Sequence, residues 1–176
     1  PPQPSKDFER IRRAVQACDD NAEAPTVAHV CKFLFTDRQN VRDPELSDAD
    51  GANLILGFAR VLSGRLRTND EYYLFGPKRN EEVLPVERRK IRLYLFMGSS
   101  FVRVEEVPAG HLAAVFGLDD VDCKSLTLSD DPSCQPLRGS EHGIRPLVKV
   151  HIEPENAADA EVLERGLRRL SLADAA

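Results

Sequence analysis

The feature that most constrains the fold of this chain is a run of short segments, between Thr26 and Leu128, that alternate apolar and polar residues. Such alternation is typical of β-strands, because successive side chains on a strand point to opposite faces of a sheet. Turn-forming pairs such as Ser63-Gly64 and Gly98-Ser99 separate the segments. Strands are therefore predicted over residues 27–35, 54–62, 71–75, 91–96, 101–104, 111–118 and 125–128.

Many short strands joined by turns, without helices between them, indicate a mainly β fold of the barrel or sandwich type. The chain has 176 residues, of which 41% are apolar, so it can bury the core that such a fold needs. One connection is longer than the others. We expect this polar segment, residues 37–53, to be a mobile surface loop.

Both ends of the chain carry helical patterns. Ser5 is positioned as an N-cap, apolar residues from Phe8 to Cys18 recur at helical spacing, and the polar segment 19–25 ends the pattern. Near the other end, residues 147–152 alternate as a half-buried strand would, and a second helix is predicted to begin after Asn156.

The predicted C-terminal helix has an apolar face made of Val162, Leu163, Leu167 and Leu170. One strand and one helix cannot bury their apolar faces by themselves. We therefore expect this strand and helix either to dock on the β domain or to form a dimer with a second copy of the chain.

Charge is distributed unevenly along the chain. The net charge of −5 argues against a free-standing nucleic-acid-binding domain. Residues 60–92, however, carry nine basic and five acidic side chains, so a segment of net charge +4 lies within a background of −9. Such a patch can contact phosphate, and solvated strand ends and turns are an equally good interpretation.

The four cysteines form no Cys-x-x-Cys pair and the chain has no Asn-x-Ser/Thr acceptor site, which favours a reducing setting, cytoplasmic or nuclear, and we expect the cytoplasm. Cys123, Cys134 and His142 lie close in sequence, but their spacing fits no usual zinc site, and we expect no metal. A small barrel enzyme with a metal at these three residues is the alternative. No apolar run approaches the roughly 20 residues of a membrane-spanning helix, so no membrane is expected among the partners.

The common catalytic motifs do not occur in this sequence. It contains no GxxxxGK[ST] phosphate loop, no GxGxxG, no HExxH and no GxSxG. The adjacent carboxylates Glu105-Glu106 and Asp119-Asp120 would point to opposite faces of a strand and make poor acid–base pairs. We therefore expect no catalytic residue in this chain.

Several strings of residues, in order along the chain, resemble the second domain of elongation factors 2 and G. Residues 57–68 resemble the strand and turn of the GRVFSG type in that domain. Residues 91–98 and 104–110 resemble its "MG…V.EVPAGN" segment, with His111 in the place of the usual Asn, and residues 115–128 resemble "GL.D…KT.TL". Residues from Arg145 onward resemble the entry to the third domain of the same family.

The resemblance implies a closed β-barrel of the translation-factor domain II type, with an appended strand–helix fragment of a ferredoxin-like α+β domain. Residues 1–25 would be a helical segment that follows a preceding GTPase domain. Residues 26–140 would be the barrel, and residues 141–176 an incomplete start of domain III. The parent protein is expected to be a GTPase. Its GTP and Mg²⁺ would bind to the GTPase domain, so no cofactor is expected in this chain.

In the resembling family the barrel touches ribosomal RNA. The implied partners are the ribosome or a pre-ribosomal large subunit, through RNA and protein, and the other domains of the parent chain. The predicted contact residues are the basic side chains Arg65, Arg67, Lys78, Arg79, Arg88, Arg89 and Lys90. The alternative is a rigid intramolecular hinge domain of elongation factor 2 itself, or of its spliceosomal relative, without direct RNA contact.

One short string indicates a branch of the family. Pro132-Ser133-Cys134-Gln135-Pro136 resembles a linker of the elongation-factor-like GTPase that acts late in large ribosomal subunit maturation. Elongation factor 2 proper differs here. The string therefore favours the ribosome-biogenesis branch.

Overall fold

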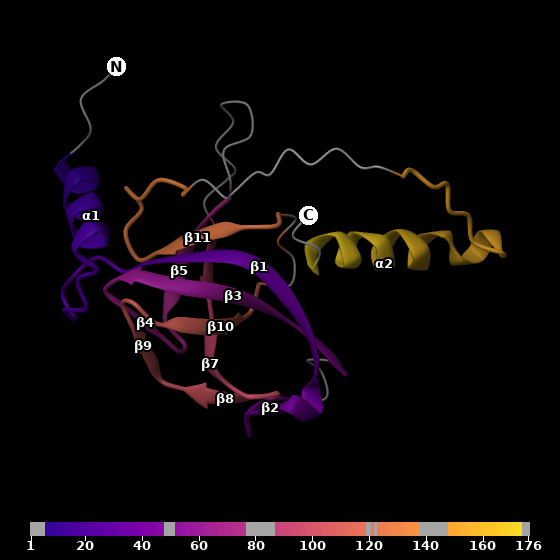
Figure 1. Ribbon diagram of the computed structural model, residues 1–176, viewed down its shortest axis with the longest axis horizontal. Coiled ribbons are helices and arrows are strands. Elements are labelled where there is room, and N and C mark those ends of the chain that lie inside the picture. The colour runs from indigo at the N-terminus through magenta and orange to yellow at the C-terminus, as the bar shows by residue number, and fades with distance from the viewer. Residues whose placement is uncertain are drawn as a thin grey trace, which may run out of the picture.

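The computed structural model describes residues 6–47, 52–76, 87–118, 121, 123–137 and 148–173 (Figure 1). In these described residues the α-helices and 3₁₀ turns are α1 (Lys6–Ala17), η1 (Arg38–Asn40), η3 (Ala157–Asp159) and α2 (Ala160–Ala173). The strands are β1 (Val27–Asp37), β2 (Val41–Arg42), β3 (Asn53–Ser63), β4 (Arg65–Arg67), β5 (Glu71–Phe75), β6 (Glu87–Lys90), β7 (Arg92–Met97), β8 (Ser100–Val104), β9 (Glu106–Pro108), β10 (Leu112–Phe116) and β11 (Leu126–Ser129).

The seven predicted strands are confirmed as β1, β3, β5, β7, β8, β10 and β11. Nine strands form one curled sheet in the order β2-β8-β7-β10-β3-β1-β11-β5-β6, and the long antiparallel pair of β1 and β3 runs through its centre (Figure 1). The strands that were not predicted are β2, β4, β6 and β9, which have two to four residues each. Segments this short show too little alternation to be recognised.

The prediction of a closed barrel is wrong. In the part of the chain that the structure describes, β2 at one end of the large sheet pairs only with β8, and β6 at the other end pairs only with β5. The chain leaves this sheet after Ser63, and β4 pairs with β9 in a separate two-stranded sheet. The two sheet ends are therefore not joined to each other, and the fold is a mainly β half-barrel.

The main core lies on one face of the curled sheet and includes Val30, Ala59, Leu93 and Val115, all of them buried. Gly57 of β3 lies within this core. A Cβ atom at that position would come within 2.9 Å of Val30 Cγ1 and 3.0 Å of Leu118 Cδ1. Glycine is therefore required there by close packing, as its place inside a predicted strand indicated.

Part of the segment 37–53, expected to be a mobile loop, forms regular structure. Residues 38–47, here called the strap, include η1 and the edge strand β2 and cover part of the opposite face of the sheet. Val41 and Leu46 of the strap are buried with Leu56, Tyr94 and Phe116 in a second apolar cluster. Residues 38–42 therefore form a 3₁₀ turn and a short strand where a loop was expected, and the two apolar side chains help to anchor the strap.

Asp43 holds the strap to the sheet through charged hydrogen bonds. Its carboxylate, 0% exposed, accepts hydrogen bonds from Tyr94 Oη at 2.7 Å and from Arg103 Nη1 at 3.1 Å. The backbone N–H of Glu45 donates a third at 3.0 Å. Burial alone would raise the pKa of Asp43, but these three bonds outweigh it and hold the pKa below its usual range.

The predicted N-terminal helix is confirmed as α1. Ile11 and Ala14 on one side of it are buried, and Ile11 packs in a third cluster with Val27, Phe75 and Cys134.

Among the described residues, no helix combines the length and the apolar character that crossing a membrane would require.

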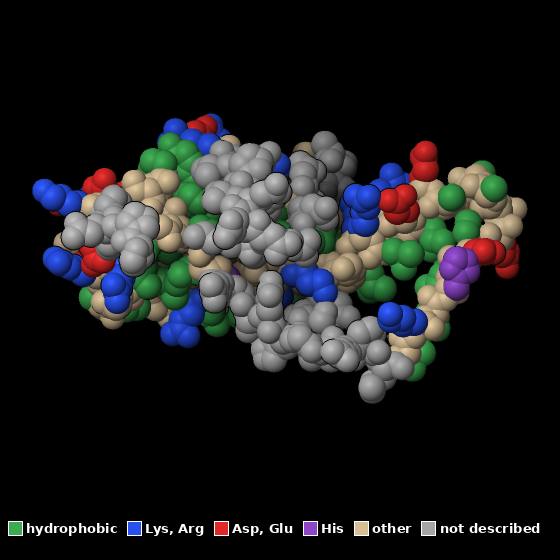
Figure 2. Space-filling model, turned by 90° about the horizontal axis from the view of Figure 1, so that it is seen from above, with side chains coloured by type: hydrophobic (Ala, Val, Ile, Leu, Met, Phe, Trp, Pro, Cys, Tyr) green, Lys and Arg blue, Asp and Glu red, His purple; other side chains and the backbone are tan. Residues whose placement is uncertain are grey.

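The C-terminal helix is also confirmed, as α2, but the strand predicted before it is wrong for its described residues. Residues 148–154 form no strand, and Val148 and Val150 are exposed. Alternation does not suffice where no neighbouring strand supplies hydrogen-bond partners. The end of α2 approaches β1, yet Val162 and Leu170 are 57% and 65% exposed, and Figure 2 shows apolar side chains of α2 at the surface.

Candidate nucleic-acid interface

Two short strands carry the described residues among the predicted contact set. β4 holds Arg65 and Arg67, and it pairs with β9 so that Arg67 lies opposite Glu106. β6 holds Arg88, Arg89 and Lys90, and it pairs with β5. The other two predicted residues, Lys78 and Arg79, lie outside the described residues.

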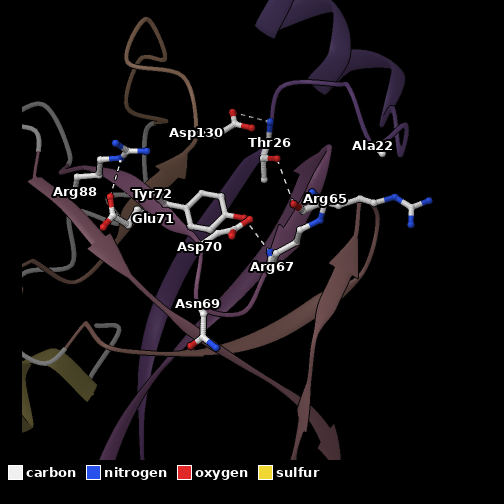
Figure 3. A pocket seen from close by; sticks show the side chains of 10 residues that line it. All are labelled: Ala22, Thr26, Arg65, Arg67, Asn69, Asp70, Glu71, Tyr72, Arg88 and Asp130. Carbon is white, nitrogen blue, oxygen red and sulfur yellow. Dashed lines mark hydrogen bonds and ion pairs between the residues drawn. The ribbon is translucent and has the colours of Figure 1, made fainter.

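The structure brings three of these arginines to one pocket of about 400 Å³ (Figure 3). Arg65 and Arg67 reach it from β4, and Arg88 reaches it from the opposite side, from β6 (Figure 3). The remaining lining residues are Ala22, Thr26, Asn69, Asp70, Glu71, Tyr72 and Asp130. The lining thus contains three acidic and three basic residues.

Each of the three arginines has a carboxylate partner. Arg65 Nη1 lies 2.7 Å from Glu106 Oε1, and Arg67 Nε lies 3.6 Å from the other oxygen of the same carboxylate. Arg88 Nε lies 3.4 Å from Glu71 Oε2, and its guanidinium lies over the Tyr73 ring at 5.5 Å. These side chains are between 33% and 56% exposed, so solvent reaches all three pairs.

Arg89 and Lys90 lie beside the pocket rather than in it. In the ladder between β5 and β6, Arg89 is opposite Tyr72 and Lys90 is opposite Glu71. Arg89 is half-buried and Lys90 is exposed. The predicted contact set therefore separates into three pocket arginines and two neighbours on the edge strand β6.

Two lining residues of the pocket have raised pKa values: Tyr72, which is buried, and Asp130, which is exposed. Burial raises the pKa of Tyr72 to about 12, and its hydroxyl oxygen accepts a hydrogen bond from the backbone N–H of Arg67 at 2.9 Å. Desolvation also raises the pKa of Asp130, whose Oδ1 accepts a hydrogen bond from the backbone N–H of Thr26 at 2.9 Å. Tyr72 is therefore neutral at physiological pH and positions the end of β4, at Arg67.

The chemistry open to this arrangement is exchange of ion-pair partners. Exposed arginine–carboxylate pairs contribute little to stability, typically about 0–1 kcal/mol. A guanidinium held this weakly can turn to a phosphate, which accepts the same two-pronged hydrogen bonds. Because Asp70, Glu71 and Asp130 also line the pocket, its field is mixed rather than strongly positive.

Sequence reasoning did not identify Glu106 as the partner of Arg65 and Arg67, or Asp130 as a lining residue of the pocket. Glu106 and Asp130 lie outside the stretch 60–92 whose charges drew attention, and they reach the pocket region through β9 and through the segment after β11. The only signal for Glu106 was its place in a short charged segment, which pairs with the equally short segment of Arg65 and Arg67.

The cysteines considered for a metal site belong to different parts of the core. Cys123 lies in the main core, whereas Cys134 lies in the cluster beneath α1. Burial raises the pKa of the Cys134 thiol to about 11, so it is not a thiolate at neutral pH. His142 is outside the described residues, and within those residues no group of three His, Cys, Asp or Glu side chains could hold a metal ion.

Comparison with known proteins reveals no matching family model but several related proteins. Ribosome assembly protein 1 of Schizosaccharomyces pombe is 32% identical over 79% of this chain, and Elongation factor-like GTPase 1 of Mus musculus is 30% identical over 76% of it. Elongation factor 2 of Encephalitozoon cuniculi is 23% identical over 94%. The chain spans 14% of the length of the first two and 19% of the third. We conclude that this chain is homologous to one segment of the elongation factor 2-like GTPases, as the resemblance of its strands and turns predicted.

Proposed function

We propose that the chain is a non-catalytic β module of an elongation factor 2-like GTPase. It would help dock the GTPase on the ribosome or on a pre-ribosomal large subunit, and it would couple the nucleotide state of the GTPase to the other domains. The docking role is supported by one observation: Arg65, Arg67 and Arg88 line the same exposed pocket. The chain that carries this pocket is related to a ribosome assembly protein and to an elongation factor-like GTPase.

Docking would work by exchange of partners at the pocket. A phosphodiester of ribosomal RNA would replace Glu71 beside Arg88, or Glu106 beside Arg67, at small cost because both pairs are solvent-exposed. Phosphate contacts of this kind position a protein without reading sequence. Since the pocket also holds carboxylates, the contact would be weak and would add to contacts made elsewhere in the GTPase.

The test is charge reversal in the full-length GTPase that carries this chain. Arg67→Glu with Arg88→Glu should weaken association with ribosomal subunits about tenfold near 0.1 M salt, because two phosphate contacts become repulsive. Sedimentation with purified subunits measures the association. Arg168→Glu is the matched control, since Arg168 is also exposed and paired with a carboxylate, Glu164, but lies on α2 away from the pocket.

A second candidate is a rigid intramolecular hinge without RNA contact. The existing partners of the pocket arginines favour it, because Glu106 and Glu71 already use these guanidinium groups to tie neighbouring strands together. Subunit association that is the same for the Arg67→Glu/Arg88→Glu variant and for the control would favour this hinge over the docking role.

A further inference from the structure

The turn between β3 and β4 meets the segment that follows α1. The Gly64 N–H donates a hydrogen bond to the Asp19 carbonyl oxygen at 2.7 Å, and the Ser63 hydroxyl donates one to the Pro25 carbonyl oxygen at 2.8 Å. Thr26 adds a hydrogen bond from its hydroxyl to the carbonyl oxygen of Arg65 at 3.3 Å. The lead-in (residues 18–26) is therefore attached to the turn at several points along its length.

Arg65 spans the gap between the lead-in and β9. Its Nε donates a hydrogen bond to the Asp20 carbonyl oxygen at 2.9 Å, while its Nη1 pairs with Glu106 at 2.7 Å. The two bonds use different edges of one planar guanidinium. A single side chain thus connects the lead-in to the two-stranded sheet of β4 and β9.

Gly64 allows the close approach that these bonds need. Its φ of +66° lies in the left-handed region, and a Cβ atom there would come within 2.7 Å of Thr26 Cα. The Gly64 carbonyl oxygen also accepts a hydrogen bond from Ala109 N–H at 3.0 Å. The turn is therefore bonded on one side to the lead-in and on the other to the segment after β9.

The lead-in is short and begins at a firmly packed helix. Ile11 and Ala14 of α1 are buried, and the Asp19 N–H donates to the Ala14 carbonyl oxygen at 3.0 Å, so the helix end and the attached turn share Asp19. Little chain is left between α1 and the turn that could absorb a movement.

We propose that residues 63–65 lock α1 to the β module, so that a displacement of α1 is carried directly into β4 and β9. Arg65 is the positioning residue of this joint, acting through Asp20 and Glu106. The joint would provide a physical route for the coupling role proposed above. The mechanical link itself does not depend on that role, but its use in the GTPase does.

The test is hydrogen exchange of α1 amides in the 176-residue chain, with β1 and β3 amides as the internal reference. Arg65→Gln, whose side chain is too short to join Asp20 to Glu106, should speed exchange in α1 by about threefold to tenfold, the range for loss of one net hydrogen bond, and leave β1 and β3 unchanged. Arg67→Gln is the matched control. It removes a neighbouring partner of Glu106 that does not bond the lead-in, so α1 exchange should not change.

A charge swap separates the joint from the ion pair. Arg65→Glu with Glu106→Arg restores an ion pair, but glutamate cannot donate to the Asp20 carbonyl oxygen, so α1 exchange should stay fast. Arg65→Lys should restore part of the protection, since lysine can still donate. Equal exchange in Arg65→Gln and Arg67→Gln, full recovery in the swap, or faster exchange in β1 and β3 as well would overturn the proposal. The assay contains no ribosome, so failure of docking would not affect its result.

Discussion

Two clusters in this molecule pair arginine with carboxylate groups but differ in their exposure to solvent. One surrounds Asp43 and the other lies at the pocket. Around Asp43 the carboxylate is 0% exposed and Arg103 is 13% exposed, and their bonds hold the strap against the sheet. Around the pocket, Arg67 and Arg88 are about half exposed and so are their partners Glu106 and Glu71. Burial decides the difference. A buried charged group left without its partner is costly, whereas an exposed pair can be opened and exchanged.

The largest effect should come from Asp43→Ala. The substitution removes the acceptor that Tyr94 and Arg103 share, while Arg103 keeps Glu45 Oε2 at 2.6 Å, and we expect the free energy of unfolding to fall by about 2 kcal/mol. Urea unfolding measures it. Tyr94→Phe removes one of the hydrogen bonds and should cost about 1 kcal/mol. A loss from Asp43→Ala no larger than that of Tyr94→Phe would show that the strap is not held by the carboxylate.

The next prediction compares how Asp43 and Asp130 change the stability of the fold as pH changes. The folded pKa of Asp43 is lowered, so its stabilising contribution is present above the unfolded pKa of about 4 and is lost as pH falls through the folded value. The folded pKa of Asp130 is raised, so its ionisation weakens the fold above that folded value.

Unfolding midpoints of two asparagine variants from neutral pH to pH 3 check these signs. Asp43→Asn should lower the midpoint at neutral pH, and Asp130→Asn, which keeps an acceptor oxygen for the Thr26 N–H, should raise it. Both differences should shrink in acid. Shifts of the same sign at neutral pH would refute the contrast between the two carboxylates.

The smallest effect should come from the pocket pair of Arg88 and Glu71. Because both side chains are about half exposed, Arg88→Gln, Glu71→Gln and the double variant should each change the free energy of unfolding by about 0.5 kcal/mol or less. A double-mutant cycle by urea unfolding measures the coupling. A coupling energy well above about 1 kcal/mol would place this pair with the buried cluster and would make partner exchange costly.

The sequence predicts elements whose information is local. The long alternation of β1 and β3, and the helical spacing of α1, were visible because many residues repeat one pattern. The strap could not be predicted from local sequence. Asp43 is typical of a loop, and its bonding partners Tyr94 and Arg103 lie far from it in the sequence, on other strands. The segment 148–152 shows the opposite error, a local pattern without a partner.

The candidate site divides in the same way. The basic side chains were countable in the sequence, and three of them do share a pocket. The ion pairs of these side chains could not be predicted, because Glu106 reaches Arg65 and Arg67 only through the pairing of β4 with β9. The resemblance to translation factors identified the family, but the closed barrel it implied did not follow, since the sheet ends at β2 and β6 remain apart among the described residues.

The docking role is tested most directly by the salt dependence of subunit association for the full-length GTPase and its Arg67→Glu/Arg88→Glu variant. The slope of log K against log salt concentration reports the number of phosphates that the protein neutralises. We predict that the variant slope is shallower by roughly two units, one for each arginine that no longer neutralises a phosphate. Identical slopes for the two proteins would contradict the claim that these pocket arginines meet RNA.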